Sequence, residues 1–168
     1  MSEFSESYHL KSDNQQEVIE LLNRAKVGGY VFPVTNGWVT FVIDGGTYQS
    51  VPSLFEANTG LLFHYEYAED HGWGFGLWAG QSCLSQYSCD WNEDLVIDDS
   101  KLNLEQLSQS TGAALDELKE LLYPADIDFI FESTPAYAAA ERIGLVNFEW
   151  LSGDYMDSDE RLEGVTRV

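Results

Sequence analysis

Two neighbouring segments of the chain alternate between large apolar residues and small or polar ones, and this pattern constrains the fold more than any other feature. The segments span residues 61–67 and 73–79, and the polar loop 68–72 joins them. A period of two residues indicates half-buried β-strands, and a short connection makes neighbouring strands antiparallel. If Tyr67 pairs with Trp73, one face of this hairpin is entirely apolar. The members of that face would be Phe63, Tyr65, Tyr67, Trp73, Phe75 and Leu77.

The opposite face of the same hairpin combines glycines with polar side chains. The same pairing sets Glu66 beside Gly74 and His64 beside Gly76. Glycine weakens a strand and often marks the close approach of a ligand or another backbone. One interpretation is a shallow groove for a small molecule or a peptide, formed by His64, Glu66, Trp78, Gly74 and Gly76. The alternative is structural: a helix or a bulky neighbouring side chain packs on the glycines.

Further strands and helices are predicted both before and after this hairpin. Predicted strands are 7–10, 30–34, 38–43 and 83–91, and predicted helices are 13–26, 103–122 with a break near Gly112, and 134–144. Asp13 and Gln16 have the spacing of a capping box, and Asn36-Gly37 is typical of a hairpin turn. Thr134-Pro135 has the pattern of a helix start.

Three stretches carry weaker predictions. Residues 127–131 are interpreted as a strand or an extended linker, 92–99 as a solvated connection, and 154–163 as a frayed tail. In the run 83–91, Cys83, Tyr87, Cys89 and Trp91 are expected on one face. The chain holds 44% hydrophobic and 14% aromatic residues, which disordered acidic chains lack.

We therefore expect an α+β fold in which about three helices pack on a mostly antiparallel meander of about five or six strands. It would form a single domain spanning residues 1–168. The strand–helix–strand start and the meander would reach to about residue 91, and the helical part would span 92–168.

The charge of the chain limits its partners. The sequence contains 29 acidic and 8 basic residues, for a formal net charge of −21, and residues 85–168 hold 19 of the acids. Nucleic-acid binding and anionic membranes both require clustered Lys and Arg, so neither is expected as a direct partner. The charge either serves solubility alone or steers a cationic protein toward the surface.

Cysteine use and the N-terminus indicate a cytoplasmic protein. Cys83 and Cys89 are the two cysteines, and on one extended strand they would lie roughly 20 Å apart, too far for a disulfide. We interpret both as reduced thiols in the core. Residues 1–6 lack the basic and apolar regions of a signal peptide, and no apolar run is long enough to cross a membrane.

No motif predicts a catalytic residue, a metal ligand set or a cofactor. The glycines of 72–76 lie inside a strand pattern, whereas a nucleotide fingerprint requires a following helix. The adjacent residues Glu69, Asp70 and His71 could ligate Zn or Mn by type, but contiguous side chains do not normally face one ion. A triad of Cys83 or Cys89 with His64 or His71 lacks any local signature. The spacing of apolar residues in 104–118 is typical of a helix-turn-helix motif. Its second helix, however, carries acidic side chains instead of the Arg, Lys, Asn or Gln that contact DNA bases.

Two functional hypotheses remain. The first is a non-catalytic protein-binding module, such as an acidic inhibitor or an immunity-type protein for a basic partner, with a DNA mimic as a variant. Its partner-binding residues would be Asp154, Asp157, Asp159 and Glu160. Residues 141–152 and the aromatic meander resemble small bacterial cytoplasmic proteins, some of them immunity partners of toxins, and this resemblance implies no residue roles. The second hypothesis is a small-molecule-binding protein or an enzyme that uses the groove around His64 and Glu66.

Overall fold

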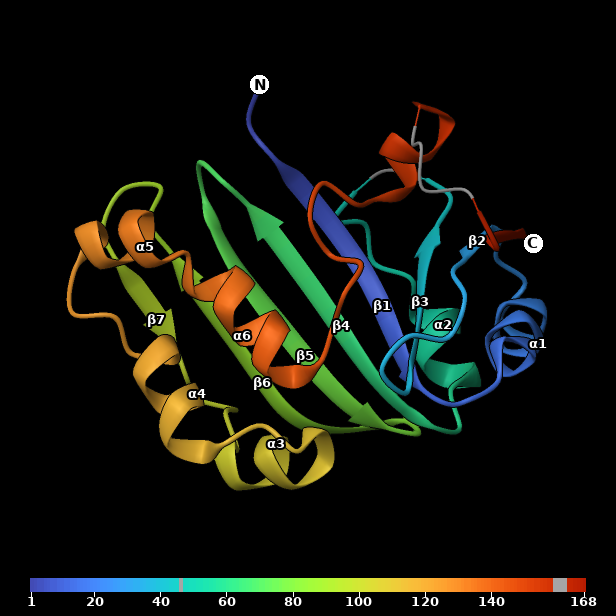
Figure 1. The fold of residues 1–168 in the computed structure, drawn as a ribbon, viewed down its shortest axis with the longest axis horizontal. Helices are drawn as coiled ribbons and strands as arrows, with labels where there is room; N and C mark the ends of the chain where they lie inside the picture. The colour runs from blue at the N-terminus through green and yellow to red at the C-terminus, as the bar shows by residue number, and fades with distance from the viewer. Residues whose placement is uncertain (46, 159–162) are drawn as a thin grey trace.

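The computed structural model describes residues 1–45, 47–158 and 163–168, and within these residues eight strands form one antiparallel sheet (Figure 1). The order across the sheet is β7-β6-β5-β4-β1-β3-β2-β8. The strands are β1 Phe4–Lys11, β2 Gly29–Val31, β3 Trp38–Ile43, β4 Leu61–Ala68, β5 Gly72–Ala79, β6 Ser82–Asp90, β7 Val96–Asp98 and β8 Thr166–Arg167. The predicted α+β class is confirmed, but the sheet is larger than expected, because the short edge strands β7 and β8 had no clear sequence signal.

Six α-helices flank the sheet in the described part of the chain, twice the expected number. They are α1 Gln15–Ala25, α2 Pro52–Ala57, α3 Leu104–Thr111, α4 Leu115–Leu122, α5 Ile127–Ser133 and α6 Pro135–Ile143, and a 3-10 helix, η1, spans Gly153–Ser158. Helices α3 to α6 cover one face of β4 to β7, while α1 and α2 lie at the other end of the sheet, around β1 and β3 (Figure 1). None of the helices in the described ranges is both long and apolar enough to span a bilayer.

The central hairpin has the predicted register. Tyr67 pairs with Trp73, Glu66 with Gly74 and His64 with Gly76. The predicted apolar face is buried against α3 to α6, and it forms one core with residues from those helices. Hydrogen bonds also join the layers; among them, Trp38 Nε1 donates to the Ile143 carbonyl at 3.2 Å, and the Tyr87 hydroxyl donates to the Leu122 carbonyl at 2.7 Å.

A second core lies on the opposite face, but it covers only part of the sheet. Residues Val18, Leu21 and Leu22 of α1 and Leu54 of α2 pack there on β1 and β3. The nearest neighbours of Gly72, Gly74 and Gly76 on that face belong to β6 and to Trp78, so no helix in the described residues covers these glycines. Of the two structural alternatives for these glycines, a covering helix is not found among the described residues, whereas a bulky neighbouring side chain is present at Gly76, where the Trp78 indole packs.

The start and end of α1 differ from the prediction. Asn14, not Asp13, caps the helix, because its side chain accepts a hydrogen bond from the Gln16 backbone at 3.0 Å. The helix ends at Lys26 in the left-handed conformation, before Gly28 is reached. The predicted turn at Asn36-Gly37 is confirmed, because both residues have positive φ and Thr35 bridges Trp38.

The C-terminal part is more helical than predicted. Residues 127–131 belong to α5, because the Asp126 side chain caps the backbone N–H of Phe129 at 3.0 Å. As predicted, Thr134 is the N-cap residue of α6 and Pro135 follows it in the first turn, but the Thr134 side chain makes no capping hydrogen bond. Thr134 also ends α5, in a left-handed conformation with φ of 42°. The predicted break at Gly112 separates α3 from α4. Residues 96–98, expected to be a solvated connection, form strand β7.

A register shift in β6 moves Cys83 out of the core. Ser85 pairs with Leu77, but Cys83 pairs with Trp78, so the alternation changes face between them. Such a bulge places one extra residue in the strand. Cys89 is buried as expected, whereas Cys83 is exposed, and both are free thiols. The interpretation of Cys83 as a core thiol is wrong.

Candidate groove on the open face of the sheet

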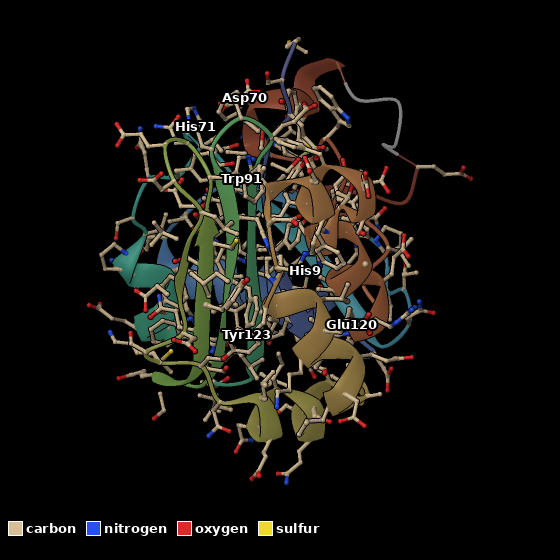
Figure 2. All side chains as sticks on the ribbon, turned by 90° about the vertical axis from the view of Figure 1, so that its left-hand side faces the viewer. His9, Asp70, His71, Trp91, Glu120 and Tyr123 are labelled. Atoms are coloured by element: carbon tan, nitrogen blue, oxygen red, sulfur yellow. The ribbon has the colours of Figure 1, made fainter. Side chains whose placement is uncertain are left out.

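The uncovered face of β4 to β7 forms an open groove of about 780 Å³. Its floor is the sheet, one rim is the segment 48–51 with Phe55 of α2, and the other rim is Asp98, Ser100 and Lys101 beside β7. In Figure 2 the sheet is seen nearly along its edge, with α3 to α6 on one side. The groove lies on the opposite side of the sheet, and the layer formed by α3 to α6 therefore does not cover it.

Cross-strand pairing arranges the floor in rows. One row contains Tyr8, His64, Gly76 and Gln86, and the next contains Glu6, Glu66, Gly74, Ser88 and Asp98. Because side chains alternate along each strand, every member of a row points to the same face. The rows therefore bring carboxylates, an imidazole and two glycines together in one shallow surface.

The glycines of β5 leave little room for a side chain on this face of the sheet. A Cβ on Gly74 would lie 2.7 Å from the Tyr87 carbonyl oxygen, and one on Gly72 would lie 2.5 Å from the Cys89 carbonyl oxygen. These contacts are with the backbone of β6, so side chains at the two positions would force β5 and β6 apart on this face. A Cβ on Gly76 would instead meet the Trp78 indole at 2.9 Å. Gly76 thus leaves room for that indole, which packs on Phe55 with ring centroids 4.7 Å apart.

Glu6, His64 and Glu66 form a cluster on the groove floor. The His64 Nε2 atom lies 2.9 Å from Glu6 Oε2 and 3.2 Å from Glu66 Oε1. The side chains of Glu6 and His64 are 11% and 17% exposed. They are therefore largely packed by the fold but remain accessible from the groove. Burial raises the pKa of Glu66, an effect that His64 opposes and Glu6 reinforces.

Aromatic and backbone contacts orient this cluster. The Tyr8 ring stacks on the His64 ring with centroids 4.3 Å apart and planes 3° from parallel. The Tyr48 backbone N–H donates to Glu6 Oε1 at 3.2 Å, and the Tyr48 hydroxyl donates to the Tyr67 carbonyl at 2.7 Å. Tyr48 has φ of 64°, an uncommon conformation for a residue with a side chain. These contacts hold the 48–51 segment against the cluster.

Carboxylates dominate the electrostatics of the groove. Its lining includes Glu6, Glu66, Asp90 and Asp98, against one lysine, Lys101. Hydrogen bonds from the Ser100 side chain and backbone lower the pKa of Asp98, so its carboxyl group is ionised at neutral pH. The groove therefore favours cationic groups.

All five residues suggested for a groove lie in this lining: His64, Glu66, Trp78, Gly74 and Gly76. Sequence reasoning did not find Glu6, Tyr8, Tyr48 or Phe55, which also line it. The alternation of β1 was a usable signal for Glu6 and Tyr8, but it gave no indication that β1 pairs with β4.

The suggested partner-binding cluster is described only in part. Asp154 is exposed in η1 and accepts hydrogen bonds from the Thr47 backbone at 3.3 Å and from the Thr47 hydroxyl. Thr47 precedes Tyr48, so Asp154 lies near the groove rim. Asp157 belongs to η1, and Asp159 and Glu160 lie outside the described residues.

The loop residues Glu69, Asp70 and His71 bond to separate partners. Glu69 accepts from the Glu3 backbone at 2.9 Å, Asp70 accepts from the Ser2 hydroxyl, and His71 Nδ1 lies 3.0 Å from Asn92 Oδ1. Asp70 and His71 stand at the turn between β4 and β5, at one end of the sheet (Figure 2). The three side chains therefore have different partners in the structure.

His9 lies in a buried polar cluster, on the same face of the sheet as its paired residue Phe63 of the helix-covered core. Its ring nitrogens lie 2.8 Å from the Ser7 and Thr40 hydroxyls, and all three residues are buried. His9 is labelled inside the molecule in Figure 2. Burial, with a smaller contribution from the charge of His64, lowers the pKa of His9 from 6.5 to about 3. A substrate could not reach this serine–histidine pair, so the cluster is structural.

Compared with models of known protein families, with curated proteins and with solved structures, the chain matches none of them.

Proposed function

We propose that the protein is a non-catalytic binding module for a basic protein, which places cationic side chains in the groove. The observation that carries this proposal is the groove lining, in which four carboxylates stand against one lysine. An acidic inhibitor or an immunity-type protein would act in this way, by covering a basic surface of its partner.

The overall charge supports the same partner class. A net charge of −21 attracts cationic proteins over a distance of roughly 8 Å at physiological salt and raises their association rate. It also opposes direct contact with nucleic acid. The charge would speed the encounter, and the groove would determine where the partner docks.

Aromatic side chains in the groove provide the short-range contacts. Trp78 and Phe55 stand together at one wall, and Tyr48 lies on the rim. Lys and Arg side chains interact favourably with aromatic faces, and Trp and Tyr are enriched among the residues that dominate binding energy. A basic side chain entering here would meet both charge and aromatic surface.

A small cationic molecule is the second candidate ligand. The groove volume of about 780 Å³ lies within the usual range for small-molecule sites. The contact between His64 and Glu66 could also serve acid–base chemistry, because the two groups lie 3.2 Å apart.

Affinity capture from a lysate of the source organism tests the proposal with three baits of defined charge. The baits are the wild-type protein, the groove variant D90N/D98N, and the control variant E105Q/E120Q. Both variants lose the same charge, but Glu105 and Glu120 are exposed on α3 and α4, within the helix layer on the other side of the sheet (Figure 2).

A basic protein should be retained by the wild-type and control baits at low salt and be depleted on the groove bait. High salt should release it from all three. Equal retention on all three baits would contradict the groove as the binding surface. The absence of any basic protein would contradict the partner class and leave the small cationic molecule as the better candidate.

A further inference from the structure

We infer that Glu6, His64 and Glu66 form a binding site for a divalent transition-metal ion, with its open side facing the groove. This inference goes beyond the proposed function and does not depend on it. It rests on the distances between the donor atoms of these three side chains, on the metals that such donors prefer, and on the neighbouring contacts that orient the side chains.

The separations fit a shared metal ion. One donor atom from each of the three residues lies within 4.8 Å of the others. Zn–N and Zn–O bonds of about 2.1 Å that enclose 90–109° separate the two donor atoms by about 3.0–3.4 Å. The measured separations from His64 Nε2 are 2.9 Å to Glu6 and 3.2 Å to Glu66. These two separations already fit a shared ion, and the donor oxygens of Glu6 and Glu66 lie within 4.8 Å of each other.

Charge balance also favours a divalent cation. Glu6 and Glu66 are directly opposite each other on β1 and β4, an arrangement in which like charges destabilise a sheet. A protonated His64 would neutralise one of the two negative charges. A divalent ion bound by neutral imidazole neutralises both.

The surroundings of the cluster resemble those of a supported metal site. Stacking on Tyr8 fixes the plane of the His64 ring, and the Tyr48 backbone holds the second oxygen of Glu6. Outer contacts of this kind orient metal ligands and contribute to affinity. Gly74 lies beside Glu66, so no side chain at that position fills the space next to the cluster, whereas the Trp78 indole packs over Gly76 beside His64. Water or a ligand in the groove could complete the coordination.

The donor set defines the class of metal. One imidazole and two carboxylates suit Zn²⁺, Fe²⁺ or Mn²⁺, and affinity for such sites rises from Mn²⁺ to Zn²⁺. Ca²⁺ prefers six to eight oxygen ligands and should bind much more weakly here.

Isothermal titration calorimetry with ZnCl₂, MnCl₂ or CaCl₂ alone tests the inference on wild-type protein and on E6Q, H64Q and E66Q. We expect one saturable Zn²⁺ site, with affinity lowered by about tenfold or more in each variant, since even outer-shell substitutions cost about 10–100-fold. The control variant H71Q removes an exposed histidine at the β4–β5 turn and should bind like the wild type. Unchanged Zn²⁺ affinity in H64Q would overturn the inference and indicate nonspecific binding to the acidic surface.

A measurement on the wild-type protein keeps the test decisive if a variant fails to fold. Paramagnetic Mn²⁺ broadens the NMR signals of nuclei near it. At substoichiometric MnCl₂, the amide signals of Gly74 and Gly76 should disappear before that of His71. Earlier loss of signals from the 92–99 segment, or uniform broadening, would place the ion elsewhere and refute the site.

Discussion

Acidification should destabilise the folded protein through His9 on β1. The ring is completely buried, and it contacts the neutral hydroxyls of Ser7 and Thr40. Burial lowers the pKa of His9 from 6.5 to about 3 in the folded state. Below pH 6.5 the unfolded chain therefore binds a proton that the folded chain does not bind.

The sign and size of the effect follow from proton linkage. Above pH 6.5 this histidine does not reduce the free energy of unfolding. As the pH falls from 6.5 toward 3, protonation of His9 in the unfolded chain lowers that free energy progressively. For these two pKa values, the loss between pH 7.5 and pH 5 is about 2 kcal/mol, because one pKa unit corresponds to about 1.4 kcal/mol.

Urea denaturation followed by tryptophan fluorescence measures this loss in the wild type and in H9Q. Glutamine retains a donor and an acceptor but does not titrate, so the wild type should lose about 2 kcal/mol more than H9Q on acidification. The exposed-histidine variant H71Q should behave like the wild type. An equal loss in wild type and H9Q would refute the reasoning, as would an imidazole NMR signal of His9 that titrates near pH 6.

Three further variants test the core, the close approach of β5 to β6, and the charge. F75A should lower the free energy of unfolding by about 3–5 kcal/mol, and a loss below about 1 kcal/mol would mean that the two faces of the hairpin are reversed. G74A should cost about 1–3 kcal/mol, because its Cβ would lie 2.7 Å from the Tyr87 carbonyl oxygen; unchanged urea stability would contradict the tight approach of β5 to β6. Neutralising the C-terminal cluster should slow association with a basic partner at low salt more than it speeds dissociation, and an unchanged association rate in stopped-flow measurements would show that the cluster is only solvated. The residues neutralised together are Asp154, Asp157, Asp159 and Glu160.

The central hairpin could be predicted from the sequence because the two-residue alternation of apolar side chains and the short connecting loop together determine its register. Alternation defines the two faces of β4 and β5, and the three-residue connection 69–71 leaves little freedom in their register. The burial of Phe75 and the position of His64 beside Gly76 follow from that register. Local pattern was sufficient here, because the two strands are adjacent in the chain.

Other parts of the fold and of the groove depend on caps, bulges and long-range strand pairing, which a local sequence pattern does not reveal. The short apolar run 127–131 suits a strand or a helix equally, and the Asp126 cap favours the helix. The bulge that exposes Cys83 shifts the alternation of β6 without any glycine or proline to mark it. Glu6 joins His64 across 58 residues of sequence, because β1 pairs with β4.

The most direct test of the groove as a binding surface is a heteronuclear NMR titration of the labelled protein with a Lys- and Arg-rich unstructured peptide. At low salt, the largest shifts should fall on Gly74, Gly76 and the Trp78 indole N–H. They should weaken in D90N/D98N, persist in E105Q/E120Q, and be absent with a Glu-rich peptide of the same length. Shifts concentrated instead on α3 and α4, or no saturable shifts in the groove, would contradict the account.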